Sequence, residues 1–338
     1  MAFRTDKIII GLADSTLGLD VSGNVLISGL AGTGTRMVTV SPDGSLGTES
    51  ISGDASIDMY GMFGDGAAGN VILNASTVLD RDMNYNNLTI HSNVWLHTAG
   101  YIVRVFGTLC ISTNAHIACD GSTGGNATST VGGVGGSAPY RYDASTFYPF
   151  AGCGSDGGTG GRYASAGTGN GTGQPGGISW ATTIANTPYI LMGGSGGGGG
   201  GPHGTGTGTG YSSWFSGSPV PFRGGVGGTG RSGLGTGSYQ APSGGGGGGG
   251  GVLIVYAKTI NNQGSIHANG GNGGNGYFAN TQGQGGGGGG GGGGTVIVYY
   301  RSTTGSGVGT LQANGGTVGS NGTGGGNGSN GYTKSYQI

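Results

Sequence analysis

Charged side chains are scarce in this chain of 338 residues. Lys and Arg together number 12 and Asp and Glu number 13, which is 7% of the residues, against roughly 25% in an ordinary globular protein. The charged surface of a typical enzyme is therefore missing. With a net charge of −1 there is also no basic stripe that could neutralise phosphates, so we expect that nucleic acid is not a partner.

Cysteine and long apolar runs are also rare. Cys110, Cys119 and Cys153 are too few, and odd in number, to indicate a disulfide framework. Residues 1–10 contain only three consecutive isoleucines after their charged residues, which is shorter than the core of a signal peptide or a membrane span. We therefore expect synthesis in a reducing cytoplasm without a signal peptide, and no membrane insertion.

Glycine is what the chain has in excess, with 92 residues. Residues 1–120 hold 15 of them, which leaves 92 − 15 = 77 among the 218 residues from 121 on. Uninterrupted runs at 244–251 and 285–294 exclude collagen, which needs glycine at every third position. A flexible linker is the plain alternative, because ordering glycine costs more backbone entropy than ordering any other residue.

The sequence next to the glycine runs favours order. Both long runs lead directly into strand-like segments, Val252–Tyr256 and Thr295–Tyr300, and 270–275 repeats an Asn-Gly-Gly-like pattern with a period of three. That period would leave two of the three faces of a polyglycine-II helix without side chains. Backbones could then approach closely enough to satisfy one another's buried N–H and C=O groups. We predict a bundle of packed polyglycine-II helices.

A pseudo-repeat connects the glycine-rich part to the rest of the chain. Residues 252–271 and 295–316 both read strand, turn, short strand and glycine arm, with Ile254 and Ile297 in matching positions. A more diverged copy covers 101–121. Repeats of this kind bury their apolar face by stacking. We expect these strands to share one sheet or coil, with the glycine arms on one side.

The predicted fold class is all-β with essentially no α-helix, because short apolar runs between turn residues show no helical periodicity. Three parts are expected. Residues 1–56 form an attachment or oligomerisation segment, 57–123 a short-strand β-domain that is a sandwich or β-helix-like, and 124–338 a glycine-rich polyglycine-II region with the interleaved strands of 252–271 and 295–316.

Catalytic motifs are missing or accidental. Gly193–Gly197 matches G-x-S-x-G but lacks the preceding strand and following helix of a serine-hydrolase elbow. The histidines are scattered; His91 and His97 could meet on adjacent strands, although surface positions suit them better. Carboxylates between 54 and 82 could pair for glycan cleavage, which is disfavoured because acidic residues nearly vanish after residue 120. We predict no enzyme, no metal site and no cofactor.

Several segments resemble the β-structured, glycine-rich tail-fibre and receptor-binding proteins of tailed phages. The likeness covers roughly residues 60–338 and is carried by Asn70–Leu73, Asp82–Ile90, Gly100–Val103 and Gly107–Leu109 ahead of the glycine-rich tail. Leu30–Val38 and Asp43–Leu46 also look like repeat modules of phage or surface fibres. The glycine region is similar to adhesins that tip phage long tail fibres, whose polyglycine-II loops bind the receptor. This chain departs from them by carrying its own β-domain.

The resemblance implies a structural virion fibre or adhesin that attaches to the host surface. Its receptor-binding residues would be aromatic side chains between the glycine segments, which offer large, rigid contact surfaces: Tyr140, Tyr142, Phe147, Tyr148, Trp180, Tyr189, Tyr211, Trp214, Phe215, Tyr239, Tyr277 and Phe278. An equal alternative is that these rings pack over the ends of the glycine bundle.

The implied partners are further copies of the chain in a trimer or filament, a host cell-surface glycan or outer-membrane protein, and other virion proteins. The chain would be located in the virion. A self-assembling extracellular filament without a receptor is the alternative. Ice binding ranks last, because Thr205, Thr207 and Thr209 alternate at a spacing of two and so do not line one face of a three-fold helix.

Overall fold

The computed structural model describes residues 36–40, 46–50, 61–139, 156–160, 181–183, 190–192, 194–200, 227–231, 241–279 and 283–338. The chain divides into two compact units, Met1–Tyr60 and Gly61–Ile338. In the first, strands β1 (Arg36–Val40) and β2 (Leu46–Ser50) form an antiparallel pair with Val40 opposite Leu46. In the second, two short antiparallel strands, β10 (Ala181–Thr183) and β11 (Ile190–Met192), pair with each other.

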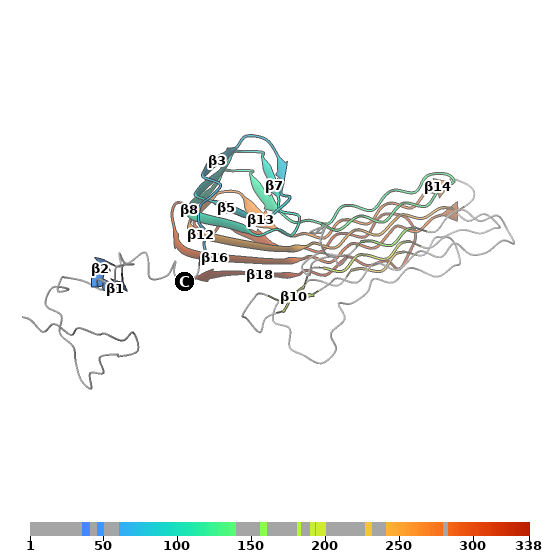
Figure 1. Ribbon diagram of the computed structural model, residues 1–338. Coiled ribbons are helices and arrows are strands. Elements are labelled where there is room, and N and C mark those ends of the chain that lie inside the picture. The colour runs from blue at the N-terminus through green and yellow to red at the C-terminus, as the bar shows by residue number, and fades with distance from the viewer. Residues whose placement is uncertain are drawn as a thin grey trace, which may run out of the picture. The chain divides into compact units, whose positions relative to one another are not determined.

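Two parallel sheets form the core of the second unit (Figure 1). The larger contains β18 (Tyr332–Gln337), β16 (Thr295–Thr303), β12 (Val252–Asn262), β8 (Val103–Ile111), β6 (Asn87–Ile90) and β3 (Asn70–Leu73) in that order, with β5 (Met83–Tyr85) also beside β8. The smaller contains β17 (Thr310–Gln312), β13 (Ser265–His267), β9 (His116–Ala118), β7 (Trp95–His97) and β4 (Thr77–Val78).

The prediction of a strand-rich chain without α-helix is confirmed for the described residues, since none of them is helical. None of their elements is therefore a helix long and apolar enough to span a membrane. The strand neighbours within both sheets are parallel, which antiparallel hairpins could not produce.

The chain passes alternately through the two sheets. β6 is followed by β7, β8 by β9, β12 by β13, and β16 by β17, so each turn of the chain lies beside the previous one. Side chains between the sheets are fully buried, among them Leu96, Leu109, Ile117, Leu253 and Ile266. Because successive residues of a strand point to opposite faces, the neighbours of these residues lie on the outer faces of the sheets.

The strand registers confirm that the repeated strands share one sheet. Ile254 pairs with Ile297, and Val255 pairs with Val103. In the smaller sheet Ser265 lies between His116 and Thr310. The larger sheet therefore combines strands from 57–123 with strands from the glycine-rich part.

Glycine-rich segments run side by side away from the sheets (Figure 1). Their backbone hydrogen bonds recur at every third residue: the N–H groups of Gly244, Gly247 and Gly250 donate to the carbonyls of Gly286, Gly289 and Gly292, each at 2.9 Å. Backbone hydrogen bonds of this kind arrange the glycine-rich segments in three layers. One layer is 119–127, 268–277 and 313–320; the middle layer is 131–139, 241–251, 285–294 and 325–331; the third is 156–160, 194–200 and 227–231.

The two longest glycine runs are the interior of this array. Segment 241–251 shares backbone hydrogen bonds with six segments: 119–127, 131–139, 156–160, 194–200, 268–277 and 285–294. Segment 285–294 shares them with 194–200, 227–231, 241–251, 268–277, 313–320 and 325–331. With neighbours on every side there is no direction in which a side chain could point. A Cβ at Gly291, for example, would overlap the carbonyl oxygen of Gly248.

Segments in an outer layer can carry side chains, and these replace missing backbone partners. Asn269, Asn272 and Asn275 recur at a spacing of three along 268–277. Their Oδ1 atoms accept the N–H groups of Asn314, Thr317 and Ser320, each at 2.9 Å. The period of three recognised in the sequence therefore matches a row of side chains on the outside of the array.

Adding a methyl group should destabilise the protein more at an interior segment than at a segment on the edge of the array. We expect Gly291→Ala to lower the free energy of unfolding by more than about 2 kcal/mol, because an interior backbone must move to admit the Cβ. Gly326→Ala is the matched control, since the nearest atoms to its Cβ would be Thr229 N and Oγ1 at 3.6 Å. Thermal unfolding measures both. Equal melting temperatures for the two variants would contradict the six-neighbour arrangement.

Candidate functional site

Two of the twelve predicted receptor-binding residues, Tyr277 and Phe278, fall within the described residues. The others, from Tyr140 to Tyr239 in the sequence, lie outside them, as do Thr205, Thr207 and Thr209. Phe278 begins β14 (Phe278–Ala279), which pairs with β15 (Gly283–Gln284) at the end of the array far from the sheets (Figure 1).

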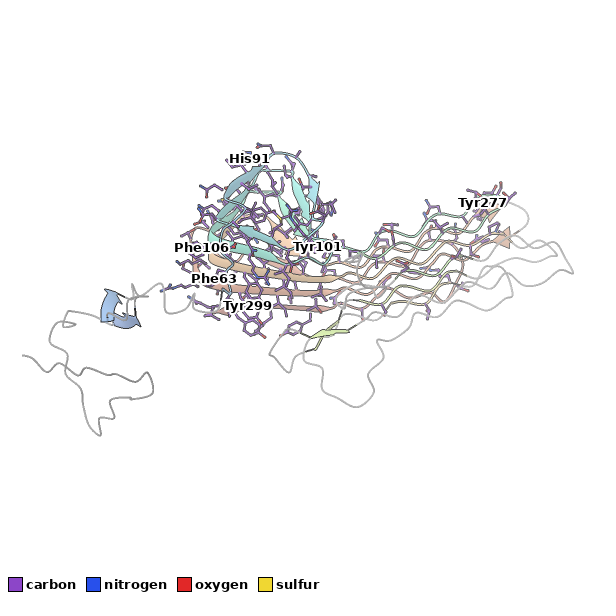
Figure 2. All side chains as sticks on the ribbon, viewed as in Figure 1. Phe63, His91, Tyr101, Phe106, Tyr277 and Tyr299 are labelled. Carbon is purple, nitrogen blue, oxygen red and sulfur yellow. The ribbon has the colours of Figure 1, made fainter. Side chains whose placement is uncertain are left out.

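The described pair has a firmly held backbone and an accessible ring. Tyr277 N–H donates to the carbonyl of Pro242 at 2.9 Å, and the Tyr277 carbonyl accepts the N–H of Gly285 at 2.9 Å. Tyr277 is half-buried, whereas 50% of Phe278 is exposed. Figure 2 shows Tyr277 at the opposite end of the second unit from Phe106. The end of the array thus presents aromatic surface on an ordered support.

The residues that flank the other aromatic stretches lie at different ends of the array. Before 140–155, Pro139 lies beside Gly251, the residue that precedes β12, and Ala138 N–H donates to Asp156 Oδ1 at 2.8 Å. Before 232–240, Arg231 N–H donates to the carbonyl of Gly287 at 2.7 Å, near the far end. The described residues next to the aromatic stretches therefore lie at both ends of the array.

A cluster of aromatic and polar side chains on the outer face of the smaller sheet was not predicted. Leu96, Ile117 and Ile266 point inward and are buried, so residues beside them in sequence point outward. On that face the ring of Trp95 stacks on His97, with centroids 5.6 Å apart and planes at 16°. The His116 ring lies 4.1 Å from Trp95 at 34°.

A buried histidine in this cluster holds the start of a glycine segment. His267, with a side chain 5% exposed, places Nδ1 2.9 Å from Asp120 Oδ1. The same carboxylate oxygen accepts the N–H of Asn269 at 2.6 Å. Asp120 therefore connects β13 to the first turn of segment 268–277.

The second histidine extends the chain of contacts. His267 Nε2 lies 3.3 Å from His116 Nδ1, which in turn lies 2.7 Å from Ser265 Oγ. Nδ1 of His116 faces both the His267 ring and the Ser265 hydroxyl, so it has a single lone pair or proton to share between them. The cluster places two imidazole rings at the base of a glycine segment.

Burial lowers the pKa of His116 below its ordinary value of 6.5, the electrostatic interaction with the nearby His267 ring lowers it further, and Asp120 partly opposes both. The pair of histidines considered from the sequence was a different one, His91 and His97. The structure brings together the rings of His116 and His267, with centroids 5.3 Å apart, whereas His91 directly follows β6. Matching 116–121 to 265–271 in the pseudo-repeat already places His116 beside Ser265, so the signal for this cluster was in the sequence.

Within the described ranges, no group of three or more His, Cys, Asp or Glu side chains is arranged to hold a metal ion. Of the described cysteines, Cys110 is half-buried and Cys119 is buried.

A ladder of tyrosines crosses the outer face of the larger sheet. Tyr256 and Tyr299 stack with centroids 5.0 Å apart, and Tyr299 and Tyr336 with centroids 5.2 Å apart. Arg104 caps one end, with its Cζ 5.7 Å from the centroid of the Tyr256 ring. Burial, with a hydrogen bond to Tyr336, raises the pKa of Tyr332 to about 12. The ladder ends at β18, the outermost strand, and Figure 2 shows Tyr299 on the side away from β7.

Comparison with models of known protein families, with curated protein sequences and with solved structures gave no match. The basis for a function is accordingly the chemistry and geometry of this chain.

The lowered pKa of His116 gives a definite sign to the pH dependence of stability. As the pH is lowered below about 6.5, His116 of the unfolded chain is protonated before His116 of the folded protein. The free energy of unfolding therefore decreases as the pH is lowered, until His116 of the folded protein is protonated too. We expect His116→Gln to reduce the loss of melting temperature between about pH 7.5 and about pH 5. The exposed His91 supplies the control, His91→Gln, which should behave as wild type. A steeper loss in His116→Gln would contradict this assignment.

Proposed function

We propose that the chain is a structural fibre or adhesin protein of a tailed-phage virion that attaches to the host surface and is not an enzyme. One observation carries the proposal: the glycine runs 244–251 and 285–294 have no side chains, and each is enclosed by six backbone neighbours. Such an interior has no catalytic chemistry. It would supply rigidity, and the described residues next to the aromatic-rich stretches lie at both ends of the array.

The hydrogen bonds of the array and the parallel strands also support a more detailed description of the fold. We propose that the glycine segments are polyglycine-II helices, because their lateral hydrogen bonds recur every three residues, the repeat of that helix. We also propose that the strands form a β-helix-like stack in preference to a sandwich, since sandwiches are built from antiparallel strands. A stack of this kind ties each coil to the next and gives the array a fixed base.

Receptor contact is assigned to the aromatic residues predicted from the sequence, with Tyr277 and Phe278 as the described pair. A ring fixed by its backbone loses little conformational entropy on binding. The proposed partners are a host cell-surface glycan or outer-membrane protein, other virion proteins, and further copies of the chain. Residues 1–56 would attach the protein to the virion, and synthesis would take place in the host cytoplasm.

A self-assembling extracellular filament is the second candidate. It is favoured by the strands at the two ends of the larger sheet, β3 and β18, each of which has a described strand on one side only. A filament would place β18 of one copy beside β3 of the next. Long polymers in electron micrographs would favour the filament, and discrete closed oligomers the fibre protein.

Removing the rings of Tyr277 and Phe278 should weaken binding to host cells and leave the protein folded. We expect the double variant Tyr277→Ser, Phe278→Ser to bind host cells at least about tenfold more weakly, which corresponds to about 1.4 kcal/mol. The melting temperature should change little, because Phe278 is 50% exposed. Sedimentation of labelled protein with cells measures the first quantity, and thermal unfolding the second.

Phe106→Ser is the matched control, since Phe106 is also exposed, at 36%, but lies on β8. It should bind cells as wild type does. Unchanged cell binding by the double variant would remove Tyr277 and Phe278 from the receptor site, and loss of folding would assign their rings to packing.

A further inference from the structure

The free edge of β18 exposes backbone groups that are ready to pair. Tyr332 N–H donates to the carbonyl of Gly294 at 3.0 Å, and Ile338 N–H donates to that of Tyr300 at 2.9 Å. In a parallel pair alternate residues bond to the neighbour, so the even-numbered residues of β18 face β16. Thr333, Ser335 and Gln337 therefore point their N–H and C=O groups the other way, where no described strand lies.

Described residues seal the adjacent edge of the array, whereas no described strand pairs with this one. In segment 313–320, the N–H groups of Gly315 and Val318 donate to Asn330 Oδ1 at 3.0 Å and to Asn327 Oδ1 at 2.8 Å. Strand edges are ordinarily protected by proline, by charge or by covering segments. β18 contains no proline, and its only charge, Lys334, lies in the outward row with the tyrosines.

We propose that β18 pairs antiparallel with β18 of a second copy of this chain, about a two-fold axis at Ser335. A two-fold contact uses the same strand twice and closes as a dimer. Residues that point to the free edge must face each other, which allows Ser335 opposite Ser335, Thr333 opposite Ser335, or Ser335 opposite Gln337, the last of which would place Lys334 opposite Ile338 and not opposite a tyrosine. The second register would set Lys334 directly opposite Lys334, a destabilising pair of like charges.

The first register completes the tyrosine ladder. It places Lys334 opposite Tyr336 of the partner subunit, and by symmetry does so twice. The ladder already ends in a cation on one side, where Arg104 lies over Tyr256. Lys334 from the partner would supply a cation at the other end, over Tyr336. Charge and ring geometry thus favour β18 of a second copy at the edge of β18, with Ser335 opposite Ser335.

Cysteine cross-linking of the full chain tests the register. In an antiparallel hydrogen-bonded pair the Cα atoms are about 5.5 Å apart, within the range that a disulfide spans. We expect Ser335→Cys to give a covalent dimer on mild oxidation. Lys334→Cys should give at least about tenfold less, because the two copies of residue 334 are not opposite each other, and wild type should give only the background of its native thiols. Equal cross-linking of Ser335→Cys and Lys334→Cys would overturn the proposal.

Light scattering of the uncross-linked protein tests the contact itself. Wild type should shift from monomer to dimer with rising concentration. Thr333→Pro should remain monomeric at the same melting temperature, because the N–H it removes faces the free edge and not β16. A wild type that stays monomeric, a Thr333→Pro variant that still dimerises, or head-to-tail polymers through β3 would each contradict the two-fold pairing. Receptor binding is not involved in any of these readouts.

Discussion

The structure depends on hydrogen bonds between backbones that have no side chains between them. An isolated glycine segment gains nothing from folding, since it has no side chain to bury and a large entropy to lose. In the two interior runs the N–H groups of 244–248, 250 and 251 and of 285 and 287–294 each donate to a carbonyl on a neighbouring segment, and the bonds recur every three residues along several neighbours at once. The stabilisation is therefore collective, and it exists only while many segments stay aligned.

That alignment comes from the parallel sheets. Segment 241–251 continues directly into β12 and segment 285–294 into β16, and these two strands pair with Ile254 beside Ile297. A conventional apolar core between the sheets fixes the strands, and the strands fix the register of the glycine segments that adjoin them. Hydrophobic burial thus positions the strands, and backbone hydrogen bonding between the adjoining glycine segments depends on that positioning. The contact between Asp120, His267 and the N–H of Asn269 strengthens one of these junctions.

Much of the fold could be predicted because its constraints are local in the sequence. The repeat around Ile254 and Ile297 predicted that the strands share a sheet, and the absence of helical periodicity predicted the absence of helix. The number of neighbours around 244–251 and 285–294 could not be predicted, since a glycine run is compatible with any number of partners. The side-chain clusters were missed although the repeat contains part of their register, since it aligns Tyr256 with Tyr299 and His116 with Ser265. Tyr336 lies on β18, which is not a copy of the repeat, so its place in the ladder could not be predicted.

The proposed function uses these properties together: an array held by backbone hydrogen bonds would carry the aromatic stretches, and sheet edges would provide contacts between copies. Hydrogen exchange of the backbone amides in 244–251 and 285–294 tests the central claim most directly. The account predicts slow exchange throughout both runs, comparable with that of the buried strands β12 and β16, because every one of these amides is enclosed. Exchange at the rate of an unstructured glycine chain would contradict it.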